Sequence, residues 1–301
     1  MKKNIGGFII RIIVFAILFV FIDLIIGKAF DAVLFNMPNT QSQTARTNYC
    51  IQKANPDCLI LGSSRASDHY VSNYIADSLE MSVYNAGRQG YGIAYAYAAL
   101  LSISERQKPK YVILELDDSE LGRTSEPTAI LKPYYSKKYI KTIIDSSSTL
   151  AERLSQNFHS FRYNGLIFNI VSGLIAPSDH NCGYVSIGNE SKINMIDADK
   201  IGIEHNDTKV NDQSMNYLSE IIRFCKNNQI KLICFSSPRY YQSDNTFTAK
   251  FLKENNVEYH DLSNYDMIKQ NPVFFYDLEH LNHKGAVAFS SLVVCELKNI
   301  I

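Results

Sequence analysis

Short apolar runs and amphipathic segments alternate along the chain from residue 57 onward. The apolar runs are bounded by Gly, Pro and polar residues, as short buried strands are. They are CLILG (58–62), SVYNAG (82–87), YVILELD (111–117), IKLICFSSP (230–238) and VEYHDLS (257–263). The helical segments between or after them cover residues 93–104, 216–228, 245–256 and 283–299. Strands that alternate with helices of this length predict a parallel sheet with helices on both faces.

Residues 57–301 are therefore predicted to form one α/β domain with a three-layer, flavodoxin-like parallel sheet. The alternation stops at about 122–213, where Tyr-, Lys- and Ser-rich stretches such as KPYYSKKY replace it. One stretch in this region, LAERLSQNF (150–158), predicts a helix. We expect a mixed insertion of helix and loop there, which is a candidate cap over a site.

The first 29 residues form a separate segment. After MKKNIGG, residues 8–27 are nearly all apolar. This length suits a helix that crosses a bilayer, which takes about 20 residues. Its two charges, Arg11 and Asp23, lie close enough to its ends to reach the polar interface. We therefore predict a signal-anchor helix at 1–29, followed by a juxtamembrane linker at 30–56 with room for one short helix.

Positive charge is concentrated at the start of this segment, in Lys2, Lys3 and Arg11. By the positive-inside rule the N-terminus stays in the cytoplasm, and the α/β domain lies outside it, in the periplasm or at the cell surface. A cleaved signal peptide is the alternative, although Gly27-Lys28-Ala29 is a poor cleavage site. A buried core helix is a third interpretation.

The amino-acid composition restricts the possible functions only slightly. Lys plus Arg and Asp plus Glu total 30 each, so charge gives no reason to expect nucleic acid as a partner. The six cysteines contain no Cys-x-x-Cys pair, and four lie in apolar runs, where cysteine behaves as a small hydrophobic residue. These four are Cys58, Cys225, Cys234 and Cys295; the others are Cys50 and Cys182. We expect no metal and no other cofactor.

Polar motifs follow the predicted strands. Ligands of open parallel sheets bind at the carboxyl ends of the strands, so these motifs are where a site is expected. They are Gly62, Ser63, Ser64 and Arg65 after the first strand, NAGRQG (85–90) after the second, Asp117 and Asp118 after the third, and FFYDLEHLNHKG (274–285) beyond the fifth.

The last motif contains Asp277 and His280, three positions apart just before a helix. An aspartate there can accept a hydrogen bond from one imidazole nitrogen, which leaves the other nitrogen as a general base. A serine hydroxyl becomes a good nucleophile when such a base removes its proton. Ser64, in a tight turn after a buried strand, is the serine that we expect His280 to activate.

At these positions the sequence resembles the SGNH/GDSL family of hydrolases, over about 57–121 and 212–299. GSS (62–64) is similar to the block that holds the family's nucleophilic serine, NAGRQG to its second block and DLEHLN (277–282) to its Asp-x-x-His block. The resemblance implies Ser64 as nucleophile, His280 as base and Asp277 as the partner that orients the base.

The resemblance also implies an oxyanion hole, the set of donors that stabilises the negatively charged oxygen formed during acyl transfer. The backbone amides of Ser64 and Gly87 would be two donors. The family's third block normally supplies an asparagine from Gly-x-Asn-Asp, whereas this chain has Asp117 and Asp118 in LELDDSEL. An ionised aspartate cannot donate, so the third oxyanion contact is in doubt.

Neighbouring polar residues offer alternatives. Ser63 is a second candidate nucleophile. Arg65, Asn85 and Arg88 lie in or beside the first two turns and are candidates for substrate binding. The two arginines would suit an anionic group, or they could form salt bridges at the rim.

Three further residues resemble catalytic groups but have simpler interpretations. Asp68 and His69 fall within the helix that follows the first turn, where a solvated or packing role is expected. His283 falls in the first turn of the closing helix. We therefore do not expect these residues to form a second catalytic pair.

A membrane-tethered domain of this kind resembles the family's subset that modifies cell-envelope carbohydrate. Members of that subset remove O-acyl groups from glycans, add them, or assist the enzymes that add them, as the alginate O-acetylation proteins and the accessory protein of teichoic-acid D-alanylation do. The resemblance implies an ester hydrolase or O-acyltransferase that uses an acyl-serine. An acylated glycan would be its substrate and a membrane acyltransferase a possible partner.

Two other functional classes stay open. One is a non-catalytic envelope scaffold that assists a membrane acyltransferase, which the missing asparagine favours and the intact Ser64, Asp277 and His280 disfavour. The other is a flavodoxin-like protein that binds a nucleotide or phosphate on loop 85–90. Against the second, NAGRQG lacks the Gly-x-Gly-x-x-Gly spacing of a dinucleotide site.

Overall fold

A five-stranded parallel sheet forms the centre of the computed structural model, which describes residues 5–123, 127–193, 210–241 and 243–301. The strand order is β2-β1-β3-β4-β5, and every neighbouring pair is parallel. The strands are β1 (Cys58–Leu61), β2 (Val83–Asn85), β3 (Tyr111–Glu115), β4 (Lys231–Ser236) and β5 (Glu258–Asp261). The predicted α/β fold is confirmed. Lys2 and Lys3, and residues 194–209 of the predicted insertion, lie outside the described residues.

The strands are buried on both faces, which is why they are continuously apolar in sequence. All four residues of β1 are buried, and they alternate between two core clusters. Leu59 and Leu61 face one cluster, whereas Cys58 and Ile60 face the other. Pairing of Leu61 with Leu114 brings the carboxyl ends of β1 and β3 together.

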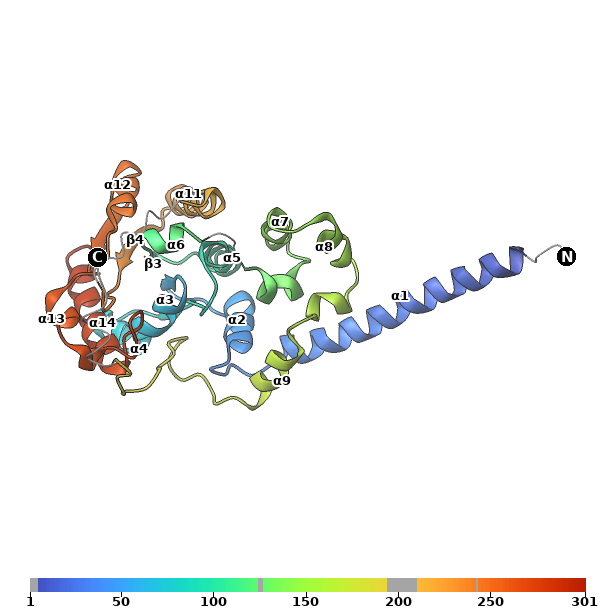
Figure 1. Ribbon diagram of the computed structural model, residues 1–301, viewed down its shortest axis with the longest axis horizontal. Helices are drawn as coiled ribbons and strands as arrows, with labels where there is room; N and C mark the ends of the chain where they lie inside the picture. The colour runs from blue at the N-terminus through green and yellow to red at the C-terminus, as the bar shows by residue number, and fades with distance from the viewer. Residues whose placement is uncertain (1–4, 124–126, 194–209, 242) are drawn as a thin grey trace.

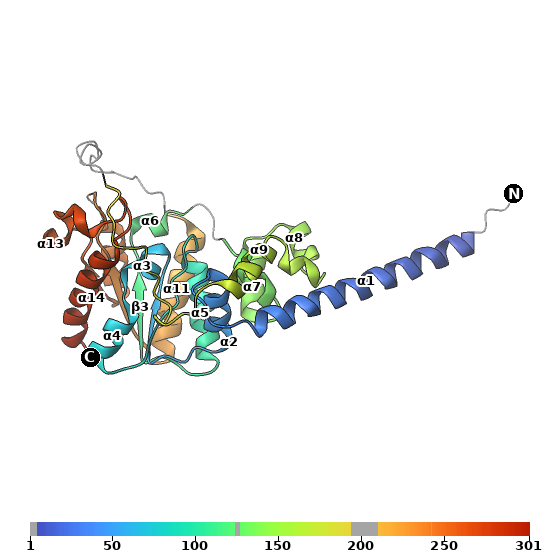
Figure 2. The ribbon, with the colours of Figure 1, turned by 90° about the horizontal axis from the view of Figure 1, so that it is seen from below.

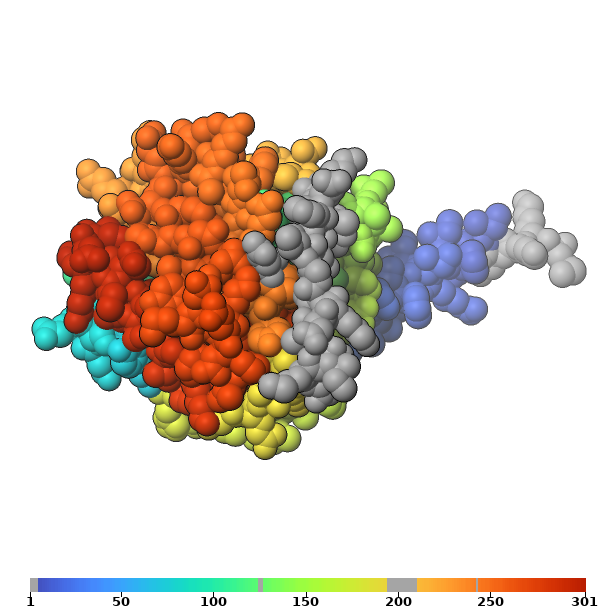
Figure 3. All heavy atoms as spheres, turned by 60° about the vertical axis from the view of Figure 1, so that its left-hand side comes forward, coloured from blue at the N-terminus to red at the C-terminus, as the bar shows by residue number. Residues whose placement is uncertain are grey.

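Helices cover both faces of the sheet (Figures 1 and 2). The Leu59 face is covered by α2 (Gln43–Gln52), α5 (Ile93–Ser104), α11 (Asp212–Asn227) and α12 (Thr246–Glu254). The Cys58 face is covered by α3 (Ser64–His69), α4 (Ser72–Leu79), α13 (Asp266–Lys269) and α14 (His283–Lys298). Figure 3 shows the surface that α12 and the last two helices form, with α4 beside it.

The segment that we expected to link the N-terminal helix to the domain contributes to the core. Residues 30–56 contain α2, of which seven residues are buried. Ser42 caps this helix by accepting a hydrogen bond from the Ala45 backbone N–H. The α2 helix packs on α5 and on α9 (Ile167–Ile175), so it is part of the folded domain.

The helices of the insertion lie at the end of the domain from which α1 (Ile5–Phe35) projects, away from the carboxyl ends of the strands (Figures 1 and 2). Besides α9 they are η1 (Ala129–Tyr134), α7 (Lys138–Ser146), α8 (Leu150–Ser155) and η2 (Ser160–Tyr163). The chain after α9 returns toward the site. The Val185 N–H donates to the Ser67 carbonyl at 3.0 Å, and the Lys192 N–H donates to the Tyr276 carbonyl at 2.8 Å.

Three of the four cysteines expected in the core are buried there. Cys58, Cys225 and Cys234 have little or no exposed surface. Cys295 is exposed, so the expectation that it packs as a hydrophobic residue is wrong. The buried side of α14 is formed by Val294 and Leu297, and Cys295 lies on its solvent side.

Candidate active site

Ser64 begins α3 directly after the buried strand β1. Gly62 makes the turn between them with a φ of 141°, a conformation that L side chains rarely adopt. A Cβ on Gly62 would also lie 2.8 Å from the Cβ of Ala66. The turn leaves Ser64 half-buried at the carboxyl end of β1, while Ser63 beside it is buried.

The loop before α14 is closed on itself by backbone and side-chain hydrogen bonds. Phe275 and Leu281 form an antiparallel bridge, and the Tyr276 N–H donates to the His280 carbonyl at 2.8 Å. Within the loop, Asp277 Oδ1 accepts from the backbone N–H groups of Glu279 and His280, both at 2.8 Å. This turn explains why a spacing of three residues brings the two side chains together.

Ser64, His280 and Asp277 form a connected series of hydrogen bonds. His280 Nε2 lies 2.9 Å from Ser64 Oγ. His280 Nδ1 lies 3.0 Å from Asp277 Oδ1 and 3.1 Å from its Oδ2. With the Nδ1 proton donated to the carboxylate, Nε2 can accept the serine hydroxyl proton. Ser63 has another partner, because its hydroxyl donates to Glu120.

Charges in the site favour an ionised aspartate and a basic histidine. Burial lowers the pKa of His280, but the hydrogen bond and charge of Asp277 outweigh it and raise that pKa above its ordinary value. Burial raises the pKa of Asp277, but hydrogen bonds from His280 and from the backbone outweigh it and lower that pKa. These directions suit a carboxylate that stabilises an imidazolium.

Asp68 is an additional charged group beside the site, although its position in the sequence predicted only a solvated or packing role. It lies one helical turn after Ser64 on α3 and is buried. Gln89 Nε2 donates to its two carboxylate oxygens at 2.9 and 3.2 Å. Burial raises the pKa of Asp68, and its charge helps to raise that of His280. The sequence did contain a signal for this placement, because Asp68 lies four positions after Ser64 and residues at that spacing share one face of a helix.

His69 supports the loop before α14 from inside the core. The backbone N–H of Leu281 donates to His69 Nε2 at 3.0 Å, and His69 Nδ1 lies 2.8 Å from Ser237 Oγ. The Ser237 hydroxyl donates to Glu115 Oε1 at 2.9 Å, so the Nδ1 proton of His69 points to Ser237. Burial, with nearby positive charge, holds the pKa of His69 well below its ordinary value. Of the solvated and packing roles expected for His69, its complete burial fits the packing role.

Arg65 is not available to bind a substrate, which corrects that expectation. Its side chain is 3% exposed, and it forms ion pairs with Glu115, at 3.1 Å, and with Asp117. It also donates to the Ser237 carbonyl at 3.3 Å. The physical reason is the pairing of β1 with β3, which places both carboxylates beside the first residues of α3.

Arg88 and Asn85 are also committed to internal contacts, so the expectation that they bind substrate is wrong as well. Both are fully buried. Arg88 donates to Thr47 Oγ1 at 3.0 Å and to the Gly87 carbonyl at 2.7 Å. Asn85 Nδ2 donates to the carbonyls of Ala66, at 2.6 Å, and of Tyr70, at 3.2 Å.

The expected oxyanion donors differ in their surroundings. The Ser64 N–H lies at the first position of α3. The Gly87 N–H donates to Asn85 Oδ1 at 2.9 Å. A Cβ on Gly87 would lie 2.4 Å from the Ser67 backbone nitrogen, so close packing of this turn on α3 requires glycine.

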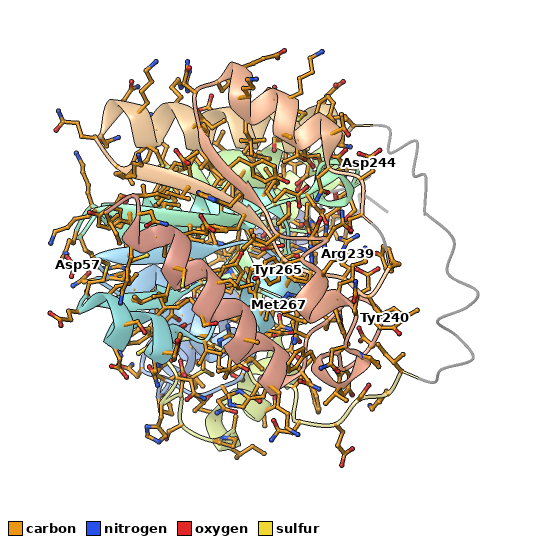
Figure 4. All side chains as sticks on the ribbon, turned by 90° about the vertical axis from the view of Figure 1, so that its left-hand side faces the viewer. Asp57, Arg239, Tyr240, Asp244, Tyr265 and Met267 are labelled. Atoms are coloured by element: carbon orange, nitrogen blue, oxygen red, sulfur yellow. The ribbon has the colours of Figure 1, made fainter. Side chains whose placement is uncertain are left out.

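Asp117, which stands where the family's asparagine is expected, is locked between two arginines. It contacts Arg65 and lies 2.6 Å from Arg239. Burial raises its pKa, but the two positive charges outweigh it and lower that pKa, so the carboxylate stays ionised and accepts only. Figure 4 shows Arg239, just after β4, at the opposite end of the sheet from Asp57, which precedes β1.

His283, the remaining candidate, has a partner outside the series of Ser64, His280 and Asp277. His283 Nδ1 lies 2.9 Å from the hydroxyl of Tyr184, at the start of α14. Within the described ranges, no group of three or more His, Cys, Asp or Glu side chains is arranged to hold a metal ion.

Comparisons with known proteins found likenesses of fold only at low identity. No protein-family model and no curated protein matches the chain. A protein from Desulfitobacterium hafniense DCB-2, described as lipolytic and of the G-D-S-L family, is 8% identical with a TM-score of 0.41 over 79% of this chain and 98% of its own. A protein from Bacteroides fragilis NCTC 9343, described as an acylhydrolase, is 9% identical with a TM-score of 0.39 over 84% of this chain and 94% of its own.

A third structure, a gut microbial enzyme described as metabolising diltiazem, is 14% identical with a TM-score of 0.32. The match covers 81% of this chain and 47% of that one. TM-scores below 0.5 carry little weight, so the chemical interpretation depends on the arrangement of Ser64, His280 and Asp277. In fold, the chain has a distant similarity to proteins described as belonging to the G-D-S-L family and as acylhydrolases.

Proposed function

We propose that the protein is a serine-dependent acyl-ester hydrolase or O-acyltransferase. The observation that carries this proposal is the hydrogen-bonded series from Ser64 through His280 to Asp277. In the first step His280 Nε2 takes the Ser64 proton while Oγ attacks the ester carbonyl carbon. The protonated His280 then gives that proton to the leaving alkoxide, and an acyl-serine remains. Water or a sugar hydroxyl, deprotonated in turn by His280, then attacks the acyl carbonyl carbon. The bond from that carbon to Ser64 Oγ breaks, His280 returns the proton to Oγ, and the acid or the acylated sugar leaves.

The oxyanion formed at each attack needs donors close to Ser64. The Ser64 N–H, at the start of α3, is the nearest candidate. The Gly87 N–H would contribute if its bond to Asn85 Oδ1 were shared or exchanged in the complex with substrate. Loss of one such donor in serine hydrolases costs about 10²–10³ in kcat, so a site with a single donor would be slow.

The substrate that we propose is an acylated cell-envelope carbohydrate, outside the cytoplasm. Support comes from α1, which is long and apolar enough to cross a membrane, and from basic residues at its start. The α1 helix also packs on η2 through Phe30 and Tyr163, whose rings stack at 5.0 Å. Such contacts favour a retained anchor over a cleaved signal. A membrane acyltransferase is a proposed partner at the same surface.

A non-catalytic scaffold is the second candidate, and one observation favours it. The Gly87 amide already donates to Asn85, and the Asp117 carboxylate, which two arginines keep ionised, can only accept, so neither supplies a donor to an oxyanion. Such a protein would keep the fold and assist a separate acyltransferase.

A fluorophosphonate probe and p-nitrophenyl acetate test the proposal on the full chain. We expect labelling and turnover in the wild type and in Ser63→Ala, and neither in Ser64→Ala. Ser63→Ala is the matched control, because it removes the adjacent hydroxyl that donates to Glu120. A folded wild-type protein that is neither labelled nor active would instead favour the scaffold.

The acceptor is tested with an O-acetylated polysaccharide. Hydrolysis releases free acetate in a Ser64-dependent reaction, whereas transfer moves the acetyl group to an added oligosaccharide with little free acetate. Release of acetate from p-nitrophenyl acetate but not from any glycan would leave the serine site in place and argue against a carbohydrate substrate.

A further inference from the structure

The helices α8 and α9 lie at the end of the domain from which α1 projects (Figures 1 and 2), and several large apolar side chains in and beside them are exposed. We call this set the apolar end face. It consists of Leu150, Leu154, Phe158, Phe168, Val171 and Ile175. Phe168 and Ile175 are 80% and 83% exposed, and apolar residues of this size gathered at one end of a protein indicate an interaction surface.

The α9 helix is apolar on both sides. Ile170 and Gly173 are buried, and a Cβ on Gly173 would lie 3.1 Å from Met37, so this side packs on the domain. Phe168, Val171 and Ile175 follow at helical spacing on the other side and are exposed. The helix sequence, IFNIVSGLI, contains no charged residue. A helix without a polar face needs a second apolar environment.

Polar and aromatic contacts fix α1 against the same end. Asp23 accepts hydrogen bonds from the backbone N–H groups of His159, at 2.7 Å, and Ser160, at 3.0 Å. Phe19 packs edge-on against Phe158 with ring centroids 5.6 Å apart. A Cβ on Gly27 would lie 2.4 Å from the His159 ring, so glycine permits this close approach.

These contacts determine how deep the end face must lie. They begin at Phe19, so only about 14 residues of α1, from Ile5 to Leu18, stand clear of the domain, or ~21 Å at 1.5 Å per residue. A hydrocarbon core is about 30 Å thick. The sequence before Ile5, which contains Lys2 and Lys3, is not an apolar stretch that would add to this length. The α1 helix can therefore span a bilayer only if Phe158 and its neighbours enter the membrane surface.

We propose that the apolar end face lies in the outer interface of the membrane that α1 crosses, with lipid as its occupant. The domain then rests on the bilayer in a fixed orientation. Glu152 and Arg153 on α8 suit the polar interface but not the hydrocarbon core. The inference rests on one part of the proposed function, namely that α1 is a retained anchor.

Fluorescence quenching in protein-free liposomes tests this placement on the full chain. The exposed Cys182 and Cys295 are replaced by Ser, and a bimane label is attached to Phe168→Cys or Ile175→Cys. Met267→Cys is the matched control, since Met267 is apolar and 76% exposed on α13, on the side opposite to α1 (Figures 1 and 4). A label at Phe15→Cys, in the clear part of α1, reports on the anchor.

We expect lipids with a shallow nitroxide to reduce the fluorescence at positions 168, 175 and 15, and aqueous iodide to quench only position 267. If aqueous iodide quenches the labels at positions 168 and 175 while the nitroxide lipids still quench position 15, the inference is overturned. The conclusion that α1 is a membrane anchor would then still stand. The end face would then be a site for a protein partner. If the nitroxide lipids do not quench the label at position 15, both the membrane anchor and the inference are overturned. Turnover of p-nitrophenyl acetate in the same vesicles reports separately on the Ser64 site.

Discussion

His280 Nε2 lies 2.9 Å from Ser64 Oγ, although 216 positions separate the two residues in the chain. One residue begins the helix after β1, and the other closes the loop before α14. The helices α3 and α14 pack side by side on the same face of the sheet, which brings the two residues together. Such a pair has a use in acyl transfer only if the histidine is held in one tautomer.

Asp277→Asn tests that requirement. The carboxylate accepts the Nδ1 proton of His280 and stabilises the imidazolium, whereas an amide can present a donor that favours the wrong tautomer. We expect kcat for p-nitrophenyl acetate to fall by about 10³–10⁴, with an unchanged melting temperature. A loss below tenfold would contradict the role assigned to Asp277.

The pH dependence of kcat/KM follows from the raised pKa of His280. As a base it must be neutral, so activity is lost as pH falls through its pKa and regained as pH rises. We expect a midpoint above the ordinary imidazole value of about 6.5. The charges of Asp277, Asp68 and Glu279 raise this pKa, so Asp68→Asn should move the midpoint down. An unmoved midpoint would show that Asp68 is neutral or too distant to matter.

His69→Phe should impair both stability and activity. The substitution leaves the Leu281 N–H without its acceptor, and a buried polar group left unpaired costs about 1–3 kcal/mol. It also removes the hydrogen bond from His69 Nδ1 to Ser237 Oγ, although the Ser237 hydroxyl still donates to Glu115. The midpoint of urea unfolding should fall, and kcat should fall because Leu281 adjoins His280. Restoration of kcat by His69→Gln, which can both donate and accept, separates positioning of the loop from a general loss of packing. Equal kcat in all three proteins would rule out a positioning role.

Local pattern in the sequence predicted the strands and most of the helices. The order of the motifs at the strand ends, together with the family resemblance, put Ser64, His280 and Asp277 forward as the candidate series. Each strand is a continuous apolar run, and each candidate residue directly follows such a run or precedes a helix. The burial of α2 could not be predicted in this way. Its sequence, QTARTNYCIQ, is polar and weakly periodic, and its core position depends on packing against α5 and α9.

The roles of Arg65 and Asp117 could not be predicted either, because each depends on the other. An arginine after a turn has the same local pattern whether it points to solvent or inward. Its direction is determined by Glu115 and Asp117, which reach it only through the pairing of β1 with β3. The aspartate at position 117 is therefore explained as one partner of a buried ion pair.

Arg65→Ala distinguishes this structural role from substrate binding. Removal of the guanidinium leaves Glu115 and Asp117 buried near each other, and loss of one partner of a buried pair costs about 3–5 kcal/mol. We expect a large fall in the free energy of unfolding at neutral pH. The lowered pKa of Asp117 means that its contribution is present above the ordinary carboxyl value of about 3.9 and lost as pH falls below it. The difference between variant and wild type should therefore shrink in acid.

Arg123→Ala is the matched control for that measurement. Arg123 pairs with Glu120 at 2.9 Å but its side chain is 29% exposed, and such pairs contribute about 0–1 kcal/mol. Urea unfolding of both variants from about pH 2.5 to about pH 8 covers the range in which the Asp117 carboxylate takes up its proton. The KM values of each variant for an anionic and a neutral ester complete the comparison. If Arg65→Ala unfolds like the wild type but has a raised KM for the anionic ester alone, the arginine binds substrate and the buried ion pair is incidental. A loss of stability several times that of Arg123→Ala, with the two KM values changed alike, would instead establish Arg65 as the residue that holds the carboxyl ends of β1 and β3 together beneath Ser64.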